Sequence, residues 1–246
     1  DAVLPTIADN QTGDDLWRSA SGVYNVDFND LGGSLLSKFQ VKATTGPDQT
    51  GILLFDWLDN AAGIGSASYT ADWGLQPSTF SLLQSGTNYV SVRVFDYAGN
   101  ISTATDVFYV RKDTTAPSIP ALVSPADKSI SNAANTLFDW SDPADDLSGI
   151  LNYAVLISTA DDFSVIASSA DAQLSQFGAD LASGFYYWKV RSKDNAGNYS
   201  AYTSTYSVRV DTAPPAIADN QAGDDAWRRA DPGAVYEVDF NDAGGS

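Results

Sequence analysis

Apolar and polar side chains alternate with a period of two along most of this chain. Tyr186, Trp188 and Val190 alternate with Tyr187, Lys189 and Arg191. Likewise, Val90, Val92 and Val94 alternate with Tyr89, Ser91 and Arg93. Such alternation is typical of strands with one buried face. It predicts further strands at Val23–Asn29, Leu35–Ala43, Ile52–Trp57, Val107–Lys112, Thr136–Trp140, Tyr153–Ser158 and Ser204–Val210.

Turn signals separate these runs, among them Gly32-Gly33, Asp142-Pro143 and Ser183-Gly184. Helical periodicity is confined to a short stretch around Thr79–Leu83. About seven short strands per hundred residues is the pattern of a β-sandwich of the immunoglobulin or fibronectin III type. We therefore predict an all-β protein made of tandem β-sandwiches.

The opening of the chain returns near its end. Ile7–Arg18 matches Ile217–Arg228 at ten of twelve positions, and Tyr24–Ser34 matches Tyr236–Ser246 at nine of eleven. The sequence therefore contains one period of a repeat and the beginning of another. Repeats of this kind build arrays that set spacing and reach.

A second repeat lies inside this period. The motif D-x-A-G-N occurs at Asp96–Asn100 and at Asp194–Asn198, and an Asp-Thr dipeptide leading to proline follows each at Asp113 and Asp211. The prolines near these positions predict short, semi-extended links. The predicted domains are a sandwich over 1–113, a sandwich over 114–211, and the opening strands of a third unit over 212–246, which repeats 5–34.

Composition limits the function. The formal net charge of −18 disfavours binding to nucleic acids and to anionic membranes. Cysteine and histidine are absent, which excludes disulfides and thiolate or imidazole metal sites. A metal site would have to use oxygen ligands, which favours hard cations such as calcium.

The motifs resemble two bacterial repeat families. Thr136–Asp142, Asn152–Ser158 and Tyr186–Ser200, with the closing Tyr206–Pro215, resemble bacterial fibronectin type III-like domains. That resemblance implies a core containing Trp140, Tyr186, Trp188 and Val190. The first unit is similar to the immunoglobulin-like repeats of large bacterial surface adhesins, which implies an extracellular location and calcium between repeats.

Acidic residues are expected to gather where the predicted sandwiches join. In a seven-stranded sandwich, the loop between the last two strands and the loop after the second strand lie at one pole. Carboxylates brought together there repel unless a cation or hydrogen bonds relieve them. Two explanations stay open: a calcium site, or Asx-turn chemistry without an ion. The candidate ligands are Asp113, Asp142, Asp145, Asp146, Asp194 and Asn198.

Catalytic patterns are weak. Without histidine no Ser-His-Asp triad exists, and the acidic pairs Asp14-Asp15 and Asp161-Asp162 give no evidence of the separation across a cleft that glycosidases need. The aromatic residues Trp17, Trp57, Trp73 and Trp140 are candidates either for sugar stacking or for core packing.

The favoured function is a non-catalytic structural repeat of an extracellular stalk, adhesin, fibre or sheath. Its expected partners are neighbouring repeats of the same protein, with a host or cell-surface ligand as a further candidate. Two alternatives stay open. One is a glycan- or protein-binding module, and the other is an accessory region of a secreted enzyme.

Overall fold

The structure of the protein is a computed structural model that describes residues 1–11, 14–220 and 238–242. Strands account for 53% and helix for 3%, so the predicted all-β class is confirmed. The described chain divides into two compact units. Unit 1 comprises Asp1–Ser118 with the loops Ala144–Leu151 and Lys193–Ser200, and unit 2 comprises Ile119–Pro143, Asn152–Ser192 and the described residues from Ala201 onward.

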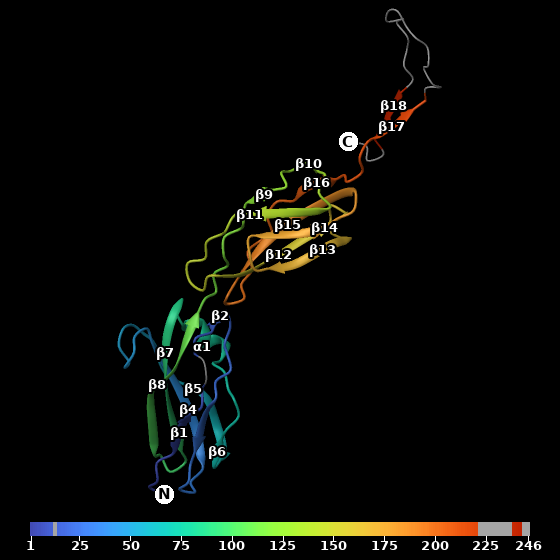
Figure 1. Cartoon of the computed structure of the whole chain (residues 1–246). Coiled ribbons are helices and arrows are strands. Elements are labelled where there is room, and N and C mark those ends of the chain that lie inside the picture. The colour runs from blue at the N-terminus through green and yellow to red at the C-terminus, as the bar shows by residue number, and fades with distance from the viewer. Residues whose placement is uncertain (12–13, 221–237, 243–246) are drawn as a thin grey trace, which may run out of the picture. The chain divides into compact units, whose positions relative to one another are not determined.

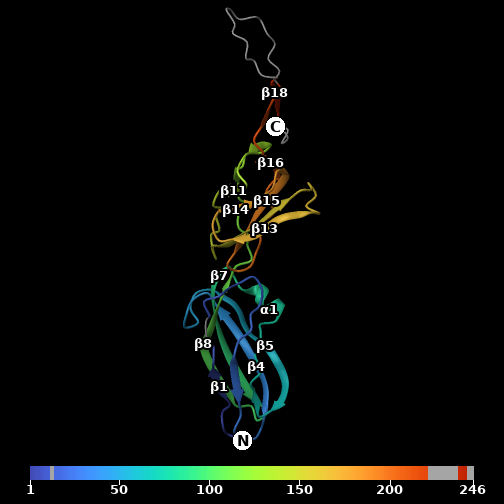
Figure 2. The same ribbon diagram turned by 45° about the vertical axis from the view of Figure 1, so that its right-hand side comes forward.

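Unit 1 is a sandwich of two sheets with one short helix (Figures 1 and 2). The three-stranded sheet has the order β1-β3-β6 and the five-stranded sheet the order β2-β8-β7-β4-β5. Its elements are β1 (Thr6–Asp9), β2 (Trp17–Arg18), β3 (Val26–Asn29), β4 (Leu36–Thr44), β5 (Leu53–Ser66), β6 (Ser68–Tyr69), α1 (Pro77–Leu82), β7 (Gly86–Asp96) and β8 (Ile101–Lys112).

Aromatic rings fill the space between the two sheets of unit 1. The rings of Phe28 and Phe39 are stacked with centroids 4.5 Å apart, and Phe39 lies 4.8 Å from Trp73. Trp73 also donates its indole N–H to the Val26 carbonyl at 3.0 Å. The alternating residues Val90, Val92 and Val94 are each fully buried, as their spacing predicts.

Unit 2 is a second sandwich, with one sheet ordered β10-β16-β15-β12-β13 and the other β14-β11-β9. Its strands are β9 (Leu122–Ser124), β10 (Ser129–Ser131), β11 (Asn135–Trp140), β12 (Ile150–Ser158), β13 (Ile166–Ala172), β14 (Gln176–Asp180), β15 (Gly184–Asp194) and β16 (Tyr206–Val210). The first two residues of β12 and the last two of β15 group with unit 1 by their contacts.

The core of unit 2 contains the four residues that the resemblance implied. Trp188 and Val190 are 0% exposed, Trp140 is 2% exposed and Tyr186 is 7% exposed. The Trp188 ring meets Phe138 edge-on, with centroids 5.0 Å apart. The tryptophans of β11 and β15 therefore anchor the two sheets to each other.

The described part of 212–246 contains one antiparallel strand pair, β17 (Ala216–Asp219) with β18 (Val238–Asn241) (Figure 1). Ile217 pairs with Phe240 in this strand pair, and Ile7 pairs with Phe28 in the antiparallel pair β1–β3. The repeated sequence thus adopts the same strand register in both places. The remainder of the predicted third unit, 221–237 and 243–246, lies outside the described residues.

Candidate functional site: two repeated acidic junctions

Three of the predicted ligands come together in unit 1. One carboxylate oxygen from each of Asp113, Asp145 and Asp194 lies within 4.8 Å of the other two. Asp113 and Asp194 are 0% exposed. Asp194 ends β15, and its turn returns the chain through Asn198, whose backbone N–H donates to Asp194 Oδ1 at 2.7 Å.

The Asn198 side chain ties this turn to the segment after β8. Its amide nitrogen donates to Asp194 Oδ2 at 2.8 Å, to the Asp113 carbonyl at 3.0 Å and to the Thr115 carbonyl at 3.3 Å. Asp113 in turn accepts bonds from the backbone N–H of Thr115 at 2.9 Å and of Ser148 at 3.2 Å. Asp145 accepts from Gly149 N at 2.5 Å.

A second cluster in unit 1 repeats this arrangement. Carboxylate oxygens of Asp1, Asp30 and Asp96 also lie within 4.8 Å of one another. Asn100 donates its backbone N–H to Asp96 Oδ1 and its amide to Asp96 Oδ2, both at 2.7 Å. The same amide reaches the carbonyls of Asp1 and Val3, as that of Asn198 reaches those of Asp113 and Thr115.

The bonds of Asp1 and Asp113 correspond as well, whereas Asp30 and Asp145 accept from backbone N–H groups at different spacings. Asp1 accepts from the backbone N–H of Val3 at 2.9 Å and of Ser34 at 3.1 Å, matching the bonds of Asp113. Asp30 accepts from Gly32 N at 2.9 Å. We call each arrangement an acidic junction: the first contains Asp1, Asp30, Asp96 and Asn100, and the second contains Asp113, Asp145, Asp194 and Asn198. The shared D-x-A-G-N motif was the sequence signal for the first junction, although Asp1, Asp30 and Asp96 were not among the predicted ligands.

Hydrogen bonds control the charge of Asp96. Burial raises the pKa of this carboxyl, but the bonds from the Asn100 side chain and backbone oppose that effect together with those from Ser34 and Gly99. The net result is a pKa below the ordinary value of 3.8. The turn therefore stabilises a buried carboxylate in its charged form.

Two predicted ligands lie apart from the second junction. Asp142 belongs to unit 2, where it accepts a hydrogen bond from the Tyr153 hydroxyl at 3.2 Å. Asp146 is exposed and is not part of the three-carboxylate group. The candidate site is therefore the set Asp113, Asp145 and Asp194 with Asn198.

The donor set of each junction suits a hard cation, because it offers only carboxylate and carbonyl oxygens. The backbone and amide N–H groups described above already bond to most of these carboxylate oxygens. This bonding offsets the repulsion between the carboxylates without an ion. Calcium at the second junction thus stays a prediction, and Asx-turn chemistry is sufficient for the observed geometry.

Calcium binding has a direct test. If the second junction holds the ion, the free energy of unfolding rises with free calcium, by about 2.7 kcal/mol at a hundredfold excess over Kd. Extracellular sites bind at roughly 10⁻⁴ to 10⁻³ M, so melting curves in EDTA and in roughly 5–10 mM calcium span the range. Asp194→Asn should remove most of the gain. Melting curves that do not change with calcium would leave turn chemistry alone.

Four of the other candidates, Asp15, Asp162, Trp73 and Trp140, have structural roles. Asp15 pairs with Arg111 at 3.2 Å, and Asp162 accepts from Ser164 N at 2.9 Å within a turn. Trp73 and Trp140 are buried in the two cores. Trp17 and Trp57 are partly exposed on unit 1, so they remain available for a ligand.

Comparisons with known proteins find sequences similar to this chain within an exoglucanase and a chitinase. No protein-family model matches the sequence. The chain is 32% identical to Exoglucanase B of Cellulomonas fimi over 186 residues, covering 71% of the chain and 16% of that enzyme. It is 29% identical to Chitinase A1 of Niallia circulans over 150 residues, covering 57% of the chain and 20% of that enzyme. The chain thus spans a fifth or less of the length of these relatives.

Solved structures similar to the chain include the fibronectin(III)-like modules of Clostridium thermocellum CbhA, with 13% identity and a TM-score of 0.44 over 84% of the chain and 94% of that structure. A tetra-tandem repeat from the extending region of a large adhesion protein is 16% identical, with a TM-score of 0.29 over 89% of the chain and 52% of that structure. The predicted resemblance to fibronectin III-like modules and to tandem adhesin repeats is confirmed. Among the described residues, no helix has the length and apolar character to cross a bilayer.

Proposed function

We propose that this chain is a non-catalytic spacer of an extracellular protein, in which tandem β-sandwiches set the reach and stiffness of a stalk, adhesin, fibre or sheath. The observation that carries the proposal is the duplicated acidic junction, whose hydrogen bonds recur in the same pattern at Asp1 and at Asp113. A binding or catalytic site needs to occur only once. A structural feature that fixes the link from one repeat to the next is expected in every repeat.

The chemistry of the second junction supports this role. The Asn198 amide joins the Asp194 turn to the carbonyls of Asp113 and Thr115. The segment beyond continues through Pro117 and Pro120, which restrict the backbone further. A linking segment with few conformations transmits orientation, whereas a flexible glycine-serine linker does not.

The spacer proposal predicts that Asn198→Ala loosens the chain while both sandwiches stay folded. Small-angle scattering of the full chain should show a broader distribution of intramolecular distances, because the segment after β8 loses two of its bonds. The exposed Asn132 provides a matched control, and Asn132→Ala should leave the scattering unchanged. Wild-type scattering that already fits two freely jointed bodies, with no change in Asn198→Ala, would contradict the proposal.

A second candidate function is an accessory region of a secreted polysaccharide-degrading enzyme. The matches to an exoglucanase and a chitinase favour it. Sequencing the gene on both sides of this segment separates the two candidates. Further copies of the D-N-Q-x-G-D-D-x-W-R motif would support the repeat array, and an adjoining catalytic domain would support the accessory role.

A further inference from the structure

The outer face of the five-stranded sheet of unit 1 carries an ordered set of aromatic and polar side chains. We call it the outer face and define it by Lys38 and Gln40 on β4, Trp57 and Asp59 on β5, and Arg93 and Phe95 on β7. These β4 and β7 residues alternate with Phe39, Val92 and Val94 of the core. Their side chains therefore point away from the core.

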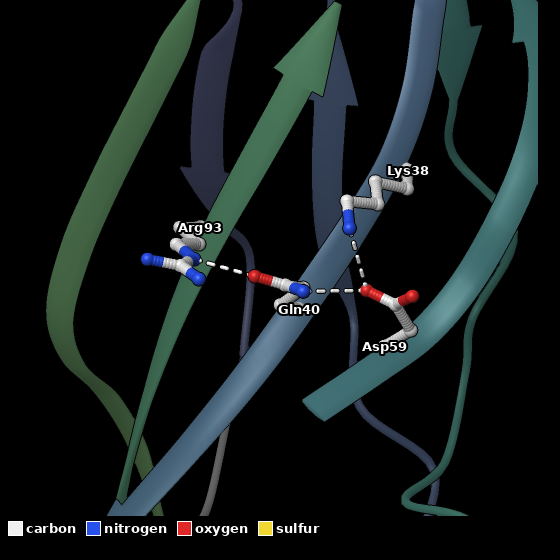
Figure 3. A network of polar contacts seen from close by, with 4 residues as sticks. All are labelled: Lys38, Gln40, Asp59 and Arg93. Atoms are coloured by element: carbon white, nitrogen blue, oxygen red, sulfur yellow. Dashed lines mark hydrogen bonds and ion pairs between the residues drawn. The ribbon is translucent and has the colours of Figure 1, made fainter. Parts of the chain in front are cut away.

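Polar contacts hold these side chains in place (Figure 3). Arg93 Nε donates to Gln40 Oε1 at 2.6 Å, and Gln40 Nε2 donates to Asp59 Oδ1 at 2.5 Å. Lys38 Nζ donates to the same Asp59 oxygen at 3.0 Å. Hydrogen bonds from Gln40 and Lys38 also hold the pKa of Asp59 below its ordinary value. A fixed surface loses little side-chain entropy when a ligand binds.

The network also positions the rings. The Arg93 guanidinium carbon lies 4.5 Å from the Trp57 ring centroid and 5.3 Å from that of Phe95. The Arg93 guanidinium therefore lies beside both the Trp57 and the Phe95 ring, and it places polar N–H groups next to them. The result is a partly exposed platform that offers flat apolar surface next to hydrogen-bonding groups.

A second group of rings lies on the same face, on strands β2, β7 and β8. Arg111 lies 6.0 Å from the Trp17 ring centroid and 5.6 Å from that of Tyr109, and the rings of Tyr89 and Tyr109 are 6.2 Å apart. Tyr89 and Phe95 are six residues apart on β7, which corresponds to roughly 20 Å along a strand. A ligand that contacts both groups must be extended.

The charges of the outer face indicate what kind of ligand it suits. Lys38 pairs with Asp59 at 3.0 Å, Lys42 with Asp56 at 3.6 Å and Arg111 with Asp15 at 3.2 Å. This pairing makes the face nearly neutral although the chain has a net charge of −18. The face therefore has little net charge to attract a polyanion or a polycation. An extended neutral molecule with flat C–H faces and many hydroxyl groups fits both the rings and the polar network.

We propose that the outer face of unit 1 binds a neutral polysaccharide chain, with Trp57 and Trp17 as stacking platforms and with Arg93, Lys38 and Asp59 as hydrogen-bonding groups. The buried Gln40 holds Arg93 and Asp59 in place. This activity goes beyond spacing, since a spacer requires no ligand. It applies whether the chain belongs to a repeat array or adjoins an enzyme.

The test is retention of the full chain on microcrystalline cellulose and on chitin powder, the two probes that the relatives' names suggest. We expect retention on at least one of them. Trp57→Ala should weaken the affinity about three- to tenfold, the range for loss of one ring contact. Trp57→Phe should retain most of the affinity. Retention should persist in about 1 M salt, where the Debye length is about 3 Å, because it does not depend on net charge.

Phe185→Ala supplies the matched control, since Phe185 is an aromatic residue of unit 2 that is 47% exposed. Its loss should leave retention unchanged, and melting curves should show that all variants fold. No retention of the wild-type chain on either solid, or equal losses in Trp57→Ala and Phe185→Ala, would overturn the proposal. The scattering test of the spacer function does not depend on this result.

Discussion

Trp188→Ala is expected to lower the free energy of unfolding of unit 2 by about 3–5 kcal/mol, the range for removing a large aromatic residue from a core. Trp188 is 0% exposed and lies between Phe138 and Tyr206, with ring centroids at 5.0 and 6.2 Å. Alanine would leave a cavity bounded by stiff β strands that have little freedom to close it. Urea unfolding measures the loss, and hydrogen exchange locates it in β12, β15 and β16.

Trp188→Phe is the control for this prediction. The indole N–H of Trp188 is buried and has no hydrogen-bond partner within the described part of the chain. Phenylalanine keeps an aromatic ring at the site and removes that unsatisfied donor, so it should cost much less than alanine. A loss below about 1 kcal/mol in Trp188→Ala would place the residue at the periphery of the core.

The alternation of side chains predicted β3, β4, β7, β8, β11, β12, β15 and β16 but not β1, β2, β6, β9, β10, β13 or β14, and it missed half of β5. Ile52–Trp57 was predicted, whereas β5 runs from Leu53 to Ser66. The missed half contains Gly63 and Gly65, both at positive φ, and the pairing of β4 with β5 shifts register several times. Such irregular pairing breaks the period of two on which the prediction rests. Glycines spaced in this way normally indicate a turn. Here the pairing with β4 shows that the strand continues through them.

The acidic junction shows where reasoning from sequence was sufficient and where it was not. The D-x-A-G-N motif carries its own turn, so the position of Asn198 beside Asp194 follows from local chemistry. The carboxylate contributed by the loop after β11 depends on the path of that loop, which the local sequence does not specify. Asp145 reaches the junction, while Asp142 turns to Tyr153. A run of nearby acidic residues in one loop does not reveal which carboxylate points inward.

The duplicated strand pair, β1–β3 and β17–β18, provides a comparison of one residue in two environments. Phe28 in β3 is 0% exposed, and its ring contacts Phe39 and Trp73 of unit 1. Phe240 in β18 has the same neighbours in sequence and the same strand register, but it is 77% exposed. Local sequence is therefore nearly constant between the two positions, and burial is the main difference.

Phe28→Ala should destabilise unit 1 by about 3–5 kcal/mol, whereas Phe240→Ala should change the stability of the dilute chain by no more than about 0.5 kcal/mol. Urea unfolding of both variants at low protein concentration measures the pair. Repeating it at high concentration tests the expectation from the sequence that neighbouring repeats associate, which we propose here, because an apolar face of the strand pair gains stability from a second sheet. In that case the cost of Phe240→Ala rises with concentration while that of Phe28→Ala does not. A large cost of Phe240→Ala that is independent of concentration would contradict both its exposure and the proposed association, since the ring would then be buried within a single chain.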